Sequence, residues 1–234
     1  MPQKLQDAVL NEIHEDPSSP RCLSLAATWL DDCLKDHGAY SLQSLELREA
    51  RLPTRVIDVG DELRDPILYE PTGDRCNGQW ASLSYCWGGV KPSIERKRES
   101  DMELQLRRGV PIEKFDRTII NAIMVTRALG IPFLWVGALG IYQDADSKDW
   151  NKESSKMNEI YGKSTITVAA ASSKSVTEGF LRRREGMQFV TLEWRLPVDT
   201  DGENGSELNK QYLFLSPAWN ADEHNIKEPL TRRG

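Results

Sequence analysis

The chain has 234 residues, of which 39% are hydrophobic and 28% charged, so it is long enough for one sizeable domain with or without an extension. Its net charge of −6 argues against general nucleic-acid binding, because a phosphate-binding face needs clustered lysine and arginine. The first 20 residues lack an apolar run, so no signal peptide is expected. The long uncharged stretch Leu129 to Tyr142 is shorter than the roughly 20 residues that cross a bilayer, so no membrane span is expected either.

The four cysteines and three histidines give no pattern typical of a metal site. No two cysteines form a C-x-x-C pair, and the histidines lie far apart in the sequence. Zinc ligands need compatible spacing, so we expect no bound metal. Unpaired cysteines are typical of a reducing compartment, which predicts free thiols and a cytoplasmic location.

One helix is predicted within the first 49 residues. Apolar residues recur every three or four positions from Leu23 to Leu34, and Gly38 is a plausible stop. The residues around this helix are polar. We therefore interpret 1–49 as an N-terminal extension with one helix.

Short strands are predicted next. Arg55 to Val59 and Pro66 to Glu70 flank a charged turn, which is typical of a hairpin. Trp80 to Trp87 is aromatic-rich and ends at two glycines, which predicts a further strand. Glu99 to Arg108 favours a short, largely exposed helix.

The segment Phe115 to Leu129 has the clearest helical pattern in the chain. It is apolar over much of its circumference, which is typical of a buried helix. Gly130 and Pro132 predict its end, because glycine favours a left-handed C-terminal residue and proline cannot continue a helix. The strand Phe133 to Val136 follows directly.

A second core helix is predicted from Asp146 or Ser147, either of which can cap it, to Tyr161. Its apolar stripe consists of Trp150, Met157, Ile160 and Tyr161. The strand Thr165 to Ala171 comes after it.

The order of these elements from Trp80 to Ala171 is strand, helices, strand, helix, strand. That order implies parallel strands joined by right-handed crossovers. We therefore predict an α/β fold with a parallel-sheet core flanked by helices and extra short strands before and after it. The core spans 50–184, and 185–234 is an extension with two strands, Phe189 to Trp194 and Tyr212 to Leu215. The final residues lack a stop-like composition, which favours a truncated end.

Two predicted strands end in unusual loops. Ligands bind at the carboxyl ends of parallel strands, where the loops Tyr85–Gly89 and Gly137–Asp144 would meet. Tyr85, Cys86, Gln143 and Asp144 are therefore expected to be neighbours. Cys86 is either a nucleophile or a buried structural cysteine, and no histidine lies between Gly38 and Ala221 to serve as its base.

Several further side chains have both a functional and a structural interpretation. Glu153 lies against the apolar stripe of its helix, so it is either an acid or base with a raised pKa or a half-exposed residue that stabilises the helix dipole. Arg127 either binds an anion or caps carbonyl groups. The aromatic residues, among them Trp87 and Trp150, are either core residues or a stacking surface for a nucleotide base.

Several common catalytic signatures are missing. The sequence has no G-x-x-x-x-G-K-[ST] loop, no G-x-G-x-x-G turn, no G-x-S-x-G elbow and no H-E-x-x-H helix. These absences argue against a Walker-type NTPase, a Rossmann dehydrogenase, a serine hydrolase and a zinc protease.

The amino-acid sequence resembles the heterokaryon incompatibility (HET) domain of filamentous fungi over about residues 50–184. The residues that carry the resemblance are Leu52-Pro-Thr-Arg-Val-Ile-Asp-Val59, Leu83-Ser-Tyr-Cys-Trp-Gly-Gly89, Ala122-Ile-Met-Val-Thr-Arg-Ala-Leu-Gly130, Leu134-Trp-Val136, Gln143-Asp144, Asp149-Trp150, Glu153, Met157 and Ile160-Tyr161.

The resemblance implies a role in fungal non-self recognition, where fusion of incompatible hyphae triggers programmed cell death. It also implies a TIR/flavodoxin-like fold, since the HET domain is similar to TIR domains, some of which cleave NAD with a glutamate. NAD would then be a substrate and Glu153 the catalytic residue. The implied ligand-binding residues are Tyr85, Cys86, Trp87, Arg127, Gln143, Asp144 and Trp150.

The chain departs from the family where chemistry is expected. Gly137 and Gly140 stand where the family usually has an acidic residue and a cysteine, Asn121 where aspartate is common, and Tyr142 where asparagine or isoleucine is common. These departures favour an alternative: a catalytically inactive HET module that acts by self-association or by binding other incompatibility or signalling proteins.

Overall fold

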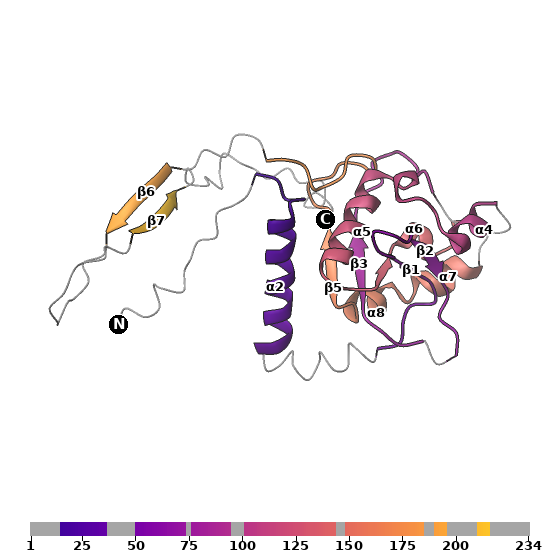
Figure 1. Cartoon of the computed structure of the whole chain (residues 1–234). Helices are drawn as coiled ribbons and strands as arrows, with labels where there is room; N and C mark the ends of the chain where they lie inside the picture. Colours follow the sequence, from indigo (N-terminus) through magenta and orange to yellow (C-terminus); the bar gives the residue numbers. More distant parts are fainter. Residues whose placement is uncertain are drawn as a thin grey trace.

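The protein contains a five-stranded mixed sheet flanked by helices (Figure 1). The computed structural model describes residues 15–36, 50–73, 76–94, 101–143, 148–184, 190–195 and 210–215. The sheet has the order β2-β1-β4-β3-β5. Its strands are β1 (Val56–Asp58), β2 (Ile67–Tyr69), β3 (Trp80–Ser84), β4 (Phe133–Trp135) and β5 (Ile166–Ala169). The helices are α2 (Pro20–Asp36), α4 (Asp101–Arg108), α5 (Arg117–Ala128), α6 (Gly137–Gly140), α7 (Lys148–Ser154) and α8 (Met157–Gly162), with a 3-10 turn η1 (Ile112–Lys114).

The parallel core is confirmed. β3 pairs in parallel with β4 on one side and with β5 on the other, so the carboxyl ends of these strands lie at one edge of the sheet. The predicted hairpin of β1 and β2 is also confirmed, but it belongs to the same sheet, because β1 pairs antiparallel with β4. Both faces of β1 are buried, which explains this interior position.

Apolar side chains cover both faces of the sheet. Alternate residues of one strand point to opposite faces, and Leu134 and Trp135 accordingly belong to two separate core clusters. The larger cluster contains Ile119, Ala122 and Ile123 of α5. The smaller one contains Ile160 of α8. Helices α5 and α8 therefore pack on opposite faces.

Helix α5 follows its prediction closely. It buries six residues, and it ends one residue before the predicted Leu129. Gly130 adopts φ 69° and donates its N–H to the Arg127 carbonyl, which closes the helix.

The predicted single helix up to Tyr161 is wrong, because two short helices, α7 and α8, occupy this segment. Between them the Ser155 hydroxyl donates to the Lys152 carbonyl, and the Lys156 N–H to the Glu153 carbonyl. Such local bonds compete with helical pairing and explain the break. Trp150 is consequently 50% exposed and does not join the apolar stripe. The proposed caps Asp146 and Ser147 lie outside the described residues.

The predicted strands of the C-terminal extension are confirmed as β6 (Val190–Arg195) and β7 (Lys210–Leu215), which form an antiparallel hairpin. The expected N-terminal helix is α2, and Leu30 on it packs against the larger core cluster. Its predicted stop, Gly38, lies outside the described residues. No helix in the described part of the chain is long and apolar enough to cross a membrane.

Candidate functional site

The carboxyl edge of β3 leads into Tyr85, Cys86 and Trp87, all of which are partly buried. The Tyr85 hydroxyl is buried, and burial raises its pKa well above the usual range; the Trp87 side chain opposes this shift without forming a hydrogen bond of good geometry. Among the described residues, Cys86 forms no disulfide. All three side chains expected to bind a ligand at this edge are therefore only partly accessible.

The loop after β4 is held largely by its own bonds. The expected exit loop contains the helical turn α6. The Gln143 side-chain amide donates to the Ile141 carbonyl at 2.9 Å and to the Gly137 carbonyl at 3.4 Å. In the part of the chain that the structure describes, no hydrogen bond joins Gln143 to Tyr85, and Asp144 lies outside that part. The amide of Gln143 therefore shapes its own loop.

Two glycines of this loop differ in the space around them. A Cβ atom on Gly137 would lie 3.6 Å from the Trp135 ring, which is an ordinary contact. A Cβ atom on Gly140 would lie 2.7 Å from Trp135 Nε1 and would force the indole to move. The close packing of Trp135 thus explains the glycine at 140, but not the glycine at 137.

A charged cluster occupies the carboxyl end of β4. Arg55 forms two hydrogen bonds to Asp149, at 2.6 and 2.9 Å, and its guanidinium lies 4.8 Å from the centre of the Tyr142 ring. It also donates to the Gly140 carbonyl at 3.0 Å and lies 3.4 Å from Glu70. The side chains of Arg55 and Asp149 are only 11% and 10% exposed, so this pair joins the residue before β1 to α7 away from solvent.

Sequence reasoning did not find this cluster, although Arg55 and Asp149 both lie in segments that resemble the HET domain. The one local sign of the cluster in the sequence is Arg55, a cation at the start of an apolar strand. Its pairing with Asp149 had no signal, because 94 positions separate the two residues.

Glu153 is buried, so the alternative of a half-exposed residue is wrong. The residue is 2% exposed, and its carboxylate accepts a hydrogen bond from Lys156 Nζ at 2.9 Å. The Lys156 ammonium also contacts the Thr54 hydroxyl at 3.3 Å. The Glu153 carboxylate is therefore engaged in an ion pair and is not a free acid or base.

Arg127 lies away from the other predicted site residues. Its guanidinium donates to the Val59 carbonyl at 2.6 and 2.8 Å. The backbone N–H of Val59 in turn donates to the carbonyl of Pro132, the residue just before β4. Burial lowers the pKa of Arg127, while nearby acidic residues oppose that shift. The contacts favour carbonyl capping, although the carbonyl belongs to another segment and not to the end of α5.

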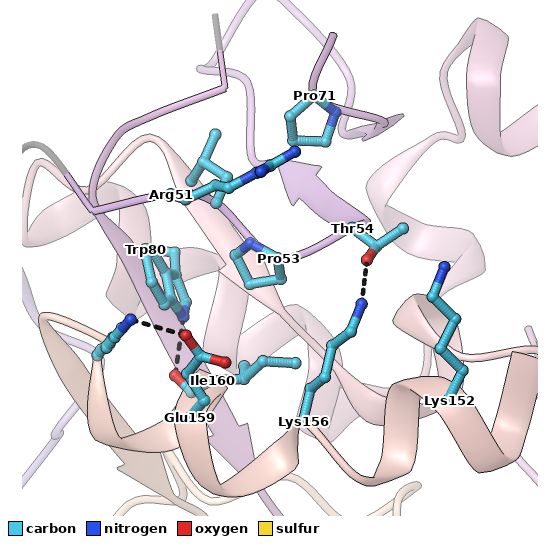
Figure 2. Close-up of a pocket in the computed structure, with 11 residues that line it drawn as sticks. Arg51, Pro53, Thr54, Pro71, Trp80, Lys152, Lys156, Glu159 and Ile160 are labelled. Carbon is cyan, nitrogen blue, oxygen red and sulfur yellow. Dashed lines mark hydrogen bonds and ion pairs between the residues drawn. The ribbon is translucent and has the colours of Figure 1, made fainter.

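A separate pocket of about 470 Å³ lies between residues 51–54 and the α7–α8 region (Figure 2). Its basic lining residues are Arg51, Lys152, Lys156 and Lys163, and its acidic one is Glu159. Pro53, Pro71 and Ile160 are among the apolar lining residues. None of the residues predicted to bind a ligand lines this pocket, and sequence reasoning did not identify it. Its lining comes from segments about 100 residues apart in the sequence.

The comparisons with known proteins give one match. Residues 80–234 match the family model described as "Heterokaryon incompatibility protein (HET)". No curated protein and no solved structure matches the chain. The matched range begins at the first residue of β3 and includes Glu153 and the α7–α8 region.

Proposed function

The chain belongs to the heterokaryon incompatibility (HET) family, and from this membership we propose that it is a cytoplasmic effector of fungal non-self recognition that triggers programmed cell death. The family match carries the role in heterokaryon incompatibility. The extension to cell death follows from the resemblance of the chain to HET-domain effectors.

The effector is proposed to act by association, either with itself or with other incompatibility proteins. The observation that supports this mode is the state of Glu153, whose side chain is 3% exposed and paired with Lys156. Gly137 and Gly140 also provide no polar side chain at the exit of β4. A site that lacks a free acid or base is poorly equipped for catalysis.

A second candidate function is cleavage of NAD at the bond between nicotinamide and ribose. The presence of the Glu153 carboxylate supports it, because a carboxylate released from Lys156 would stabilise a cationic sugar. Nicotinamide would leave with the bonding electron pair, and water would add to the ribose and release a proton. Tyr85, Cys86, Trp87, Gln143, Asp144 and Trp150 would contribute to binding. Arg127 would act only from a distance, given its bonds to Val59.

Incubation of the purified full chain with NAD distinguishes the two modes. We expect no nicotinamide release by chromatography, together with concentration-dependent association in light scattering. Release that disappears in Glu153→Gln, while the variant keeps its circular dichroism spectrum, would establish the second candidate instead. A chain that stays monomeric and binds no incompatibility protein would contradict the association mode.

A further inference from the structure

We propose that the pocket between residues 51–54 and the α7–α8 region binds a small molecule that carries phosphate groups. This pocket is separate from the strand-end loops that contain Tyr85 and Gln143. The proposal requires neither NAD cleavage nor association, so its test is independent of the proposed function.

The size and walls of the pocket suit a small organic anion. Its volume of about 470 Å³ lies within the range of sites for small molecules and cofactors. Pro53, Pro71 and Ile160 form apolar parts of the wall. The polar edge of Trp80 is already satisfied, because its indole N–H donates to the Ile160 carbonyl at 3.2 Å. The polar requirements of a ligand are therefore met mainly by the basic side chains, with the Thr54 hydroxyl as a further polar lining group.

Two of these basic residues have no acidic partner within the described residues. Arg51 and Lys152 form no ion pair there, and both are exposed. Figure 2 shows Lys152 and Lys156 on the helical side of the pocket and Arg51 on the opposite side, near Pro71. Cationic donors on opposing walls can contact different oxygens of one phosphate group or of two linked ones.

The two paired lysines retain donors for a ligand. An ammonium group has three N–H donors, and Lys156 uses two of them, on Glu153 and Thr54. Lys163 uses one on Glu159, at 2.7 Å. Four cations thus face the pocket together with one lining carboxylate, and Glu153 offsets part of the charge of Lys156. This excess of positive charge favours a polyanion over a neutral or singly charged ligand.

Titration calorimetry of the full chain with inorganic pyrophosphate and with adenosine diphosphate tests the proposal. We expect at least one of them to bind with a Kd of about 1 mM or below at low salt, and more weakly at high salt. Equal affinities would mean that the phosphates alone are recognised. Tighter binding of the nucleotide would mean that the apolar wall contributes. Failure of both to bind would overturn the proposal.

Charge variants locate the binding. Lys152→Glu should weaken it about tenfold, because it places a like charge beside the phosphates. The matched control is Lys114→Glu, which makes the same charge change on the exposed turn η1, away from the pocket lining. Equal loss in both variants would show a general charge effect and overturn the site.

A gain of affinity provides a test that partial unfolding cannot imitate. Glu159→Gln removes the carboxylate of the pocket and releases Lys163, so binding should tighten about threefold. Unchanged or weaker binding by a folded Glu159→Gln protein would contradict the proposal.

Discussion

Arg55 shows how a single side chain joins parts of the molecule that are distant in sequence. It lies before β1, and its partners Asp149 and Tyr142 follow β4. The pair is largely removed from water, so its net contribution to the stability of the fold is smaller than the cost of breaking it. Loss of one partner would leave a buried charge without compensation.

Asp149→Asn should therefore destabilise the protein by about 3 kcal/mol, measured by urea unfolding. The substitution keeps the shape of the side chain and removes the charge that balances Arg55. Lys35→Ala is the control, since it breaks the exposed pair with Asp31 on α2 and should change stability little. Similar small effects in both variants would show that Arg55 finds another partner, such as Glu70.

The two glycines after β4 should respond differently to the residue types usual in the family. Gly140→Cys should cost about 1–3 kcal/mol in the free energy of unfolding, because its Cβ would press against Trp135. Gly137→Asp should cost less than about 1 kcal/mol, since space is available and an acidic residue suits the first turn of a helix. Equal losses would mean that the indole moves aside freely.

Tyr85 should make the stability of the protein sensitive to alkali. Burial raises the pKa of its phenol, so the folded protein retains a proton that the unfolded chain loses above its pKa of about 10. Stability is then unaffected by Tyr85 below pH 10 and falls as the pH rises above it, by up to about 1.4 kcal/mol per pH unit.

Tyr85→Phe should reduce this alkaline loss and change stability at pH 7 by about 1 kcal/mol or less, because the hydroxyl has no hydrogen-bond partner of good geometry. Urea unfolding at pH 7 and pH 11 gives both quantities. Tyr161 keeps its own raised pKa in both proteins. An unchanged pH dependence would show that the phenol is accessible in the folded state.

At the scale of elements, α5 is tied to the loop after β5 by buried polar side chains, among them Asn121. Asn121 Oδ1 accepts hydrogen bonds from the backbone N–H groups of Phe180 and Leu181, at 2.9 and 3.1 Å. Gly179 has φ 72°, and a Cβ atom there would lie 2.6 Å from the same oxygen. The loop can approach the helix this closely only because residue 179 is glycine.

Asn121→Ala should cost about 2–3 kcal/mol, because two N–H groups lose their acceptor. Asn121→Asp, the residue type common in the family, keeps an oxygen at this position and should cost less. Thermal unfolding of the two variants measures the difference. Equal losses would mean that the hydrogen bonds to the loop are replaced by water.

The elements that sequence reasoning found are those with local signals. The apolar circumference of α5 and its stop at Gly130 lie within one segment, and the helix was predicted almost to its ends. The break between α7 and α8 was missed because it depends on the Ser155 hydroxyl, which bonds to the backbone in place of solvent. The charged pair of Arg55 and Asp149 and the basic pocket were missed because they depend on contacts between distant segments.

At the scale of the whole molecule, the described strands form two separate sheets, the five-stranded one and the C-terminal hairpin. Among the described strands, β6 and β7 pair only with each other. Helix α2, by contrast, places Leu30 against the larger core cluster, and Glu15 before it forms an ion pair with Arg183. The predicted extension 1–49 thus includes a helix that covers part of the core.

Two shortened chains test this difference. A chain of residues 15–184 should keep its Tm within about 2 °C of that of the full chain, whereas 50–184 should unfold at least about 4 °C lower, because it exposes the surface that α2 covers. Differential scanning calorimetry gives both values. Equal Tm values for the two chains would show that α2 adds no stability and that 50–184 is the folding unit.

The antiparallel pairing of β1 with β4 has a consequence during synthesis of the chain. β1 and β2 leave the ribosome before β4, and a two-stranded hairpin alone is marginally stable. Leu134 of β4, which pairs with Ile57 of β1, follows it by 77 positions, which corresponds to roughly 4–15 s of translation at about 5–20 residues per second. During that interval the nascent hairpin presents an open edge that β4 later covers, so chaperone contacts with the emerging chain are expected to concentrate on residues 56–69.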